Sequence, residues 1–521
     1  MNRPIRAMVV DEVPQLGARQ ALYGAVGALL ISALLLYVES SRLAGLLDTP
    51  VGTILLLPIA LGLAGFVVLR DDRLWTVSAI LSLVVFVVRT GEGSFGALEI
   101  FYGLYSLGGL LIWFAKELAF YRRPIVRSRY DFWLLSATLL CLLLGGLGFL
   151  LNGGDIRLGM REASACLTLL FYFPVRRTLK NRRDVLFVVG AVALLGLING
   201  YVNVVNYQEK VIASALEYGA VNARSAMNEV LSSVLVCASF SIVLLGKTMK
   251  ERLAGLVGLA GFSGLLVLSL SRGPILATGF GCVVALVLAA PGKIGRVSSY
   301  LLLAVVINLA AAWILFPEFV TSIGENISDR FAAIEQITGD KALGSRFLET
   351  QAIAQEFIPA SPMIGYGFGV PYDYYDAAFG TSFTSYYTHN GYLSPLSKFG
   401  IPPGLFVLVI LPLPLLRLPF WSTRQRPSGD RLIAAGAIAA LVSIMVTNVT
   451  SNAVVYYTEL TLIGIVLAIF DFLDSIGIDK IIKILSSLPR RPNITLNVID
   501  FDHCLINRFP QLQLPIFQDN R

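Results

Sequence analysis

Fourteen long, continuous apolar runs take up almost half of this 521-residue sequence. A helix that crosses the roughly 30 Å hydrocarbon core of a bilayer needs about 17–25 mostly apolar residues, and most of the runs approach or reach that length. They lack the alternation that marks a barrel wall. The runs occupy residues 20–38, 52–69, 74–88, 97–115, 132–151, 163–175, 184–205, 229–246, 253–270, 274–290, 298–316, 401–416, 432–449 and 453–473. We therefore predict an all-α, polytopic integral membrane protein with about 12–14 transmembrane helices, although the run at 163–175 is short for a span.

Charged residues are too few to cover a soluble protein of this length. Asp, Glu, Lys and Arg make up 14% of the chain and hydrophobic residues 56%, against about 25% and 45–50% in soluble domains. This excludes a cytosolic enzyme, a disordered chain and a disulfide scaffold. The net charge of +7 follows from topology, because placing the N-terminus inside puts most Lys and Arg residues on the cytoplasmic side. We expect both termini in the cytoplasm, contacts with membrane lipids and no nucleic-acid partner.

The spacing of the runs predicts four parts of the chain. Residues 1–316 would hold about eleven spans, and residues 398–473 about three more. Between them, residues 317–397 form a long, partly helical periplasmic loop rich in Gly, Tyr, Phe and acidic residues. Long loops in compact proteins usually carry function. Residues 474–521 are expected to be a cytoplasmic tail that begins with a basic amphipathic helix.

Three residues on the outer side stand out as chemical candidates. Arg272 lies in a tight break between two runs, Arg346 opens a predicted amphipathic helix of the long loop, and His389 lies where that loop returns to the membrane. Each also has a simpler interpretation. An arginine at the end of a span commonly reaches lipid headgroups, Arg346 could pair with an acidic loop residue, and a lone loop histidine is often only a surface residue.

Together, two arginines and a histidine form a set suited to glycosyl transfer without a metal or cofactor. An extracytoplasmic transferase has no nucleotide sugar and needs a lipid-linked donor. Arginine can clamp the diphosphate leaving group through two hydrogen bonds, and histidine can remove a proton from the attacking hydroxyl. The glycine-rich segment at 365–369 follows no strand, so we interpret it as a hinge or tight turn rather than a nucleotide site.

The motifs that hold these residues resemble the O-antigen ligase and O-antigen polymerase superfamily. They are found at residues 268–273, 344–346, 362–367 and 389–396. The resemblance implies an inverting glycosyltransferase of lipopolysaccharide or exopolysaccharide synthesis, acting on an undecaprenyl-diphosphate-linked oligosaccharide at the periplasmic face of the bacterial inner membrane. It implies that Arg272 and Arg346 hold the donor diphosphate, that His389 is catalytic, and that Asn390 and Tyr366 support the site.

Several alternatives stay open at this point. The acceptor would be lipid A-core in a ligase and the growing glycan in a polymerase, and the sequence does not separate the two. A transporter or flippase of lipid-linked glycan or a small anion is the main rival. The apolar runs carry no carboxylate or basic group near their midpoints, which argues against ion-coupled transport. A non-catalytic subunit of a polysaccharide export system is a third alternative.

Overall fold

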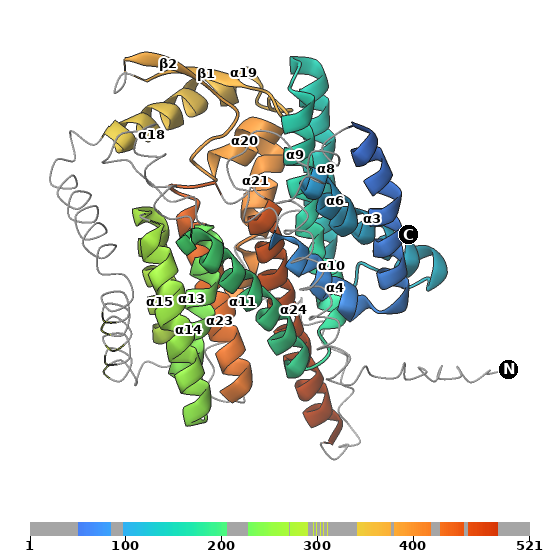
Figure 1. Ribbon diagram of the computed structural model, residues 1–521, viewed down its shortest axis with the longest axis vertical. Helices are drawn as coiled ribbons and strands as arrows, with labels where there is room; N and C mark the ends of the chain where they lie inside the picture. The colour runs from blue at the N-terminus through green and yellow to red at the C-terminus, as the bar shows by residue number, and fades with distance from the viewer. Residues whose placement is uncertain are drawn as a thin grey trace, which may run out of the picture. The chain divides into compact units, whose positions relative to one another are not determined.

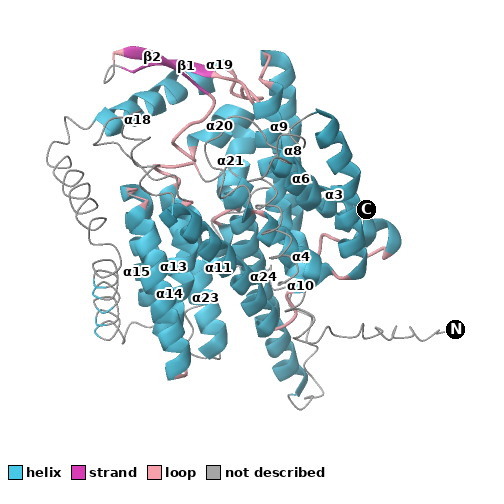
Figure 2. Cartoon of the chain, in the orientation of Figure 1, coloured by secondary structure: helices cyan, strands magenta, loops and turns pink. Residues whose placement is uncertain are grey.

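The computed structural model describes eight segments of the chain and five single positions between residues 295 and 310. The segments are residues 50–84, 97–205, 228–269, 271–289, 341–376, 380–417, 428–452 and 457–487. Met1–Leu473 forms one compact unit and Asp474–Arg521 a second. Helices make up almost all of the described structure, with one small sheet (Figure 2). The apolar run at 20–38, most of the run at 298–316 and most of the predicted tail lie outside the described residues.

Four described helices are long and apolar enough to cross a membrane, judged by length and composition. They are α8 (Arg129–Asn152), α11 (Arg182–Val205), α14 (Met249–Leu268) and Gly429–Thr447 of α23 (Ser428–Thr447). Shorter apolar helices are Leu57–Arg70 of α3 (Pro50–Arg70), α13 (Glu229–Leu245), Arg272–Val287 of α15 (Arg272–Ala289) and α21 (Ile401–Ile410). The prediction of an all-α, polytopic membrane protein is confirmed.

Two other predicted runs are each divided among several short helices. The run at 97–115 is one helical stretch interrupted by π-turns, α6 (Ala97–Gly103), η1 (Leu104–Gly108), α7 (Gly109–Ala115) and η2 (Lys116–Phe120). The short run at 163–175 is divided among α9 (Ile156–Thr168), η3 (Leu169–Phe171) and α10 (Tyr172–Thr178). Further helices are α4 (Asp72–Ser82), α20 (Leu393–Phe399), η7 (Leu413–Arg417) and α24 (Tyr457–Ser487).

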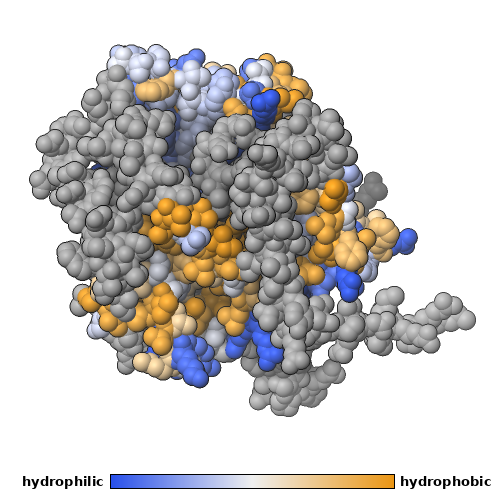
Figure 3. All heavy atoms as spheres, viewed as in Figure 1, coloured by the Kyte–Doolittle hydropathy of each residue, from blue (hydrophilic) through white to orange (hydrophobic). Residues whose placement is uncertain are grey.

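Apolar side chains are exposed along several of the helices. On α15, Leu276, Phe280 and Val283 are all more than half exposed and recur at helical spacing, so they form one outward stripe. Figure 3 shows hydrophobic residues gathered across the middle of one face, with hydrophilic residues above and below. Large exposed apolar surfaces of this kind are stable only against another apolar phase, which here is the bilayer.

Helices α13, α14, α15 and α23 form a tight bundle. Helix α15 packs against α23, and α13 packs against α14, α15 and α23 (Figure 1). The helices approach closely at Gly281 of α15, where an added Cβ would lie 2.4 Å from the carbonyl oxygen of Ala439. Small residues at such crossings let helices pack closely in a membrane. The bundle therefore fixes the start of α15, where Arg272 lies.

The long loop folds into a small module rather than a set of isolated turns. It contains α18 (Lys341–Ala352), η6 (Ile353–Phe357), α19 (Ile358–Ala360) and the antiparallel hairpin β1 (Tyr372–Asp376) and β2 (Thr381–Ser385). Ile353, Ile358 and Tyr372 form its buried core. The predicted helix at Arg346 is present, and Phe347 on it is 68% exposed. The hairpin was not predicted, because its two strands, YDYYD and TSFTS, lack a regular alternation of apolar and polar residues.

The glycine-rich segment at 365–369 packs directly against α8, where the loop module meets that helix. We call this contact the glycine crossing. Gly365, Gly367 and Gly369 all have positive φ angles, of 78°, 92° and 62°, which side chains other than glycine rarely adopt. The Gly367 N–H donates to the carbonyl of Lys398 at 2.9 Å, and the Phe368 N–H donates to that of Gly145 in α8 at 3.0 Å. The interpretation as a tight turn fits this segment, and its glycines are required by close backbone contact.

We expect Gly367→Ala to destabilise the protein strongly. An added Cβ would lie 2.0 Å from the backbone nitrogen of Phe149, in a backbone conformation unfavourable for alanine, and strain and overpacking together cost about 2–6 kcal/mol. Thermal unfolding of the purified protein in detergent measures the effect. Gly146→Ala is the matched control, because an added Cβ there meets nothing within 4 Å. Equal melting temperatures for the two variants would show that the crossing is not tightly packed.

Candidate functional site

His389 is held by a buried carboxylate. Its ring Nδ1 lies 2.8 Å from Oε2 of Glu349 on α18, and its backbone N–H donates to the same oxygen at 3.3 Å. The Glu349 side chain is 2% exposed, whereas that of His389 is 37% exposed. A carboxylate accepts hydrogen bonds, so it favours the tautomer with the proton on Nδ1 and leaves Nε2 as the acceptor. The arrangement gives an accessible imidazole with a fixed orientation.

Tyr372 completes the contacts of Glu349. Its hydroxyl oxygen lies 2.5 Å from Glu349 Oε1 and 2.6 Å from the carbonyl oxygen of Tyr387. Burial, followed by the negative charge of Glu349, raises the pKa of Tyr372, so its hydroxyl stays protonated and remains a donor. The Tyr387 ring packs edge-on against His389 with centroids 5.2 Å apart. The imidazole is therefore fixed by a carboxylate and an aromatic ring.

The segment after His389 is anchored at two points. Oδ1 of Asn390 accepts the backbone N–H groups of Tyr392 at 2.9 Å and Leu393 at 3.2 Å, so it stabilises the start of α20. The Gly391 N–H donates to the carbonyl of Asn448 at 2.8 Å, and an added Cβ on Gly391 would clash with the Asn448 side chain. The structure thus gives Asn390 a positioning contact next to His389.

Arg272 is half-buried at the first turn of α15. Ser271 before it donates its hydroxyl to Glu229 of α13. Gly273 after it approaches Thr450, whose Oγ1 would lie 2.2 Å from an added Cβ. Because Gly391 packs on Asn448, the segments that carry Arg272 and His389 both rest on the turn that follows α23, residues 448–452. This shared support brings two predicted site segments into one neighbourhood.

Arg346 reaches the same neighbourhood through α18. It is half-buried and precedes Glu349 by three residues, so the two side chains emerge one helical turn apart. Tyr366 lies further away. Its ring packs on Phe357 with centroids 5.2 Å apart, and Phe357 in turn packs on Tyr372. Arg346 is thus one helical turn from the carboxylate that binds His389, while Tyr366 packs on the module through Phe357.

Glu349 is a candidate site residue that sequence reasoning missed. The only sequence signal is a glutamate one helical turn after Arg346 in a predicted amphipathic helix. Its partner His389 is 40 residues further along the chain, and spacing alone does not predict a contact over that separation. The hairpin and the glycine crossing bring the later part of the loop back to α18, so that His389 contacts Glu349.

Residues 256–409 match the family model described as O-antigen ligase. No curated protein matches the chain. The matched region starts within α14 and ends within α21, so it includes Arg272, the loop module with Arg346, and the segment that carries His389. The motifs that suggested a resemblance all lie inside it or overlap it. This part of the chain is therefore similar to the O-antigen ligase family.

Proposed function

We propose that this protein transfers a glycan from an undecaprenyl-diphosphate-linked donor to a sugar hydroxyl of an acceptor. The single observation that carries the proposal is the pair of His389 and Glu349, because an exposed imidazole oriented by a buried carboxylate is an arrangement suited to general-base catalysis. The match of residues 256–409 to the O-antigen ligase family model supports glycan transfer as the reaction class. The proposed location is the periplasmic face of the bacterial inner membrane, with both termini cytoplasmic.

The proposed reaction begins with proton removal. Nε2 of His389 accepts the proton of the acceptor hydroxyl as that oxygen attacks the anomeric carbon of the donor sugar. The resulting imidazolium is stabilised by Glu349 through Nδ1. The bond between the anomeric carbon and the diphosphate oxygen breaks, and its electron pair leaves with the lipid diphosphate. Attack from the opposite face inverts the anomeric configuration.

The two arginines serve the leaving group. Arg272 and Arg346 bind the diphosphate and neutralise the charge that grows on it as the bond breaks. The permanent charge of a guanidinium group lets this step proceed without a metal ion or cofactor. The acceptor is lipid A-core if the protein is a ligase, and the growing chain of a lipopolysaccharide or exopolysaccharide if it is a polymerase.

A glycan profile of a strain lacking the protein tests this function. We expect loss of polymer on lipid A-core if the protein is a ligase, and single repeat units if it is a polymerase. Wild-type protein should restore the profile. Arg346→Lys should fail to do so, because an ammonium group cannot make the bidentate hydrogen bonds that a guanidinium group makes with phosphate. Arg157→Lys, at an exposed position of α9, is the matched control. An unchanged glycan profile in the deletion strain would contradict the proposed function.

A further inference from the structure

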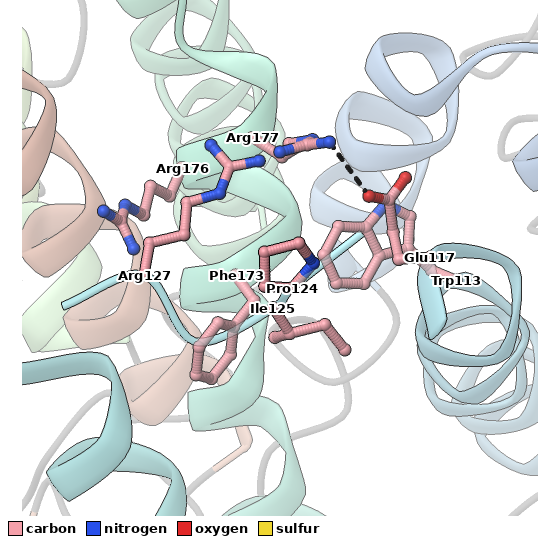
Figure 4. Close-up of a pocket in the computed structure, with 8 residues that line it drawn as sticks. All are labelled: Trp113, Glu117, Pro124, Ile125, Arg127, Phe173, Arg176 and Arg177. Atoms are coloured by element: carbon pink, nitrogen blue, oxygen red, sulfur yellow. Dashed lines mark ion pairs between the residues drawn. The ribbon is translucent and has the colours of Figure 1, made fainter. Parts of the chain in front are cut away.

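A pocket lined by arginines lies at the other end of α8 from the glycine crossing. It is formed where η2, the following loop and α10 meet, and Figure 4 shows its side chains. The residues that matter here are Arg127, Arg176, Arg177, Glu117, Pro124 and Ile125. Helix α8 begins at Arg129 beside this pocket, while Asn152 at its far end donates to the carbonyl of Tyr366 at 3.0 Å. The pocket is therefore separate from the site around His389.

Glu117 is the unusual member of the pocket. It is 2% exposed, and its Oε2 pairs with Arg177 at 3.2 Å. Its other oxygen, Oε1, is buried and has no hydrogen-bond partner within the part of the chain that the structure describes. An unsatisfied buried carboxylate oxygen is costly, so Oε1 is suited to a donor from a bound molecule.

The arginines are balanced by acidic residues. Arg176 pairs with Asp131 and with Asp471, and Arg177 pairs with Glu117. Arg127 is exposed at the pocket. Three positive and three negative side chains thus meet here, and their formal charges cancel. A strongly anionic ligand is poorly matched to such a set, whereas a ligand with both signs of charge is well matched.

An apolar groove continues from the pocket. The two hollows share Pro124 and Ile125, and the groove is lined beyond them by Phe114, Leu118, Val126 and Leu135. It holds about 750 Å³ of empty space, which includes the space open to the outside. Tyr121 and Trp133, 49% and 41% exposed, lie close by in the sequence, and such aromatic residues gather at the membrane–water interface. These features suit a charged pocket at headgroup depth and a groove that holds a hydrocarbon chain.

We propose that this pocket binds a phospholipid that carries a primary ammonium group, such as phosphatidylethanolamine. The phosphate contacts Arg127 and Arg177, the ammonium donates to Glu117 Oε1, and one acyl chain lies along the groove. Phosphatidylcholine lacks N–H donors for Oε1, and phosphatidylglycerol lacks the positive charge. The structure therefore assigns a preference among three bilayer lipids to Glu117, which is independent of the proposed glycan transfer.

Native mass spectrometry of the delipidated protein in detergent tests the assignment. Each of the three lipids is titrated separately, and we expect phosphatidylethanolamine to bind about tenfold or more tightly than the other two, since a charge-assisted hydrogen bond is worth about that factor. Glu117→Gln should remove the preference, and Arg127→Ala should weaken all three lipids. Arg123→Ala is the matched control, because Arg123 is exposed in the same loop and lies over the Tyr121 ring. That variant should keep the full preference.

Three results would overturn the proposal. Equal binding of all three lipids, unchanged by Glu117→Gln, would show that the bound lipid is non-specific annular lipid. A preference for phosphatidylglycerol would make an anionic lipid the occupant. Equal competition by glycerophosphoethanolamine, which has the headgroup without acyl chains, would remove the groove from the site. If Glu117→Gln fails to fold, the wild-type preference for phosphatidylethanolamine over phosphatidylcholine still decides the matter.

Discussion

Glycan transfer should fall by about 10²–10⁴-fold when His389 is replaced by alanine, the range that a positioned general base contributes. The imidazole is the group that Glu349 orients at 2.8 Å, and alanine leaves no acceptor for the hydroxyl proton. The measurement is the rate of product formation from a purified lipid-linked donor in proteoliposomes. The rate is expressed per folded molecule, because alanine leaves the buried Oε2 of Glu349 with only the backbone N–H of residue 389 as a donor.

The chain provides its own control for this experiment. It has only two histidines, and the second is His503. We expect His503→Ala to transfer glycan at the wild-type rate. Normal product from His389→Ala would show that another group removes the proton and would end the assignment of His389 as the base.

The second large effect is expected from Glu349→Gln, which keeps the shape of the side chain and removes its charge. The glutamine oxygen can still accept from Nδ1 of His389, and its amide can donate to the hydroxyl oxygen of Tyr372, so the geometry is retained. The imidazolium formed during proton transfer loses its counter-charge, and kcat should fall by about 10²–10⁴-fold. KM for the donor should change little, because Glu349 has no proposed contact with the diphosphate.

A comparison of kcat with KM separates this role from a structural one. A variant that merely loosened the loop module would raise KM and lower the melting temperature as well as reduce kcat. Glu356→Gln, at an exposed glutamate of η6, is the matched control and should behave as wild type. A melting temperature well below that of the wild type, with kcat per folded molecule unchanged, would rule out the positioning role.

Sequence reasoning predicted the membrane helices well because their signal is local. Helix α8 at Arg129–Asn152 is close to the apolar run at 132–151, since a span is defined by its own hydropathy and by an N-cap such as Ser128. The short run at 163–175 was harder, because η3 divides it into helices that are too short to be recognised from hydropathy. The described residues therefore establish the class of the protein, while the number of spans remains a prediction.

The candidate site could be predicted in part. Arg272, Arg346 and His389 were identified from residue type, position at breaks and the side of the membrane, all of which are visible in the sequence. The contacts between them depend on how residues 341–399 fold, and the hairpin there lacks a regular alternation of apolar and polar residues. Glu349 is invisible for that reason, because its importance comes from a contact that exists only after the loop has closed.

The turn at residues 448–452 has a consequence for protein engineering. It supports Gly273 and Gly391, yet it lies beyond the end of the matched family region at residue 409. The glycine crossing likewise rests on α8, before that region begins. Residues 256–409 therefore depend on contacts with the rest of the chain and cannot be exchanged as an independent unit. A chimaera that exchanges them between two proteins to change acceptor preference needs the recipient's α8 and its turn after α23 to match the donor's contact surfaces.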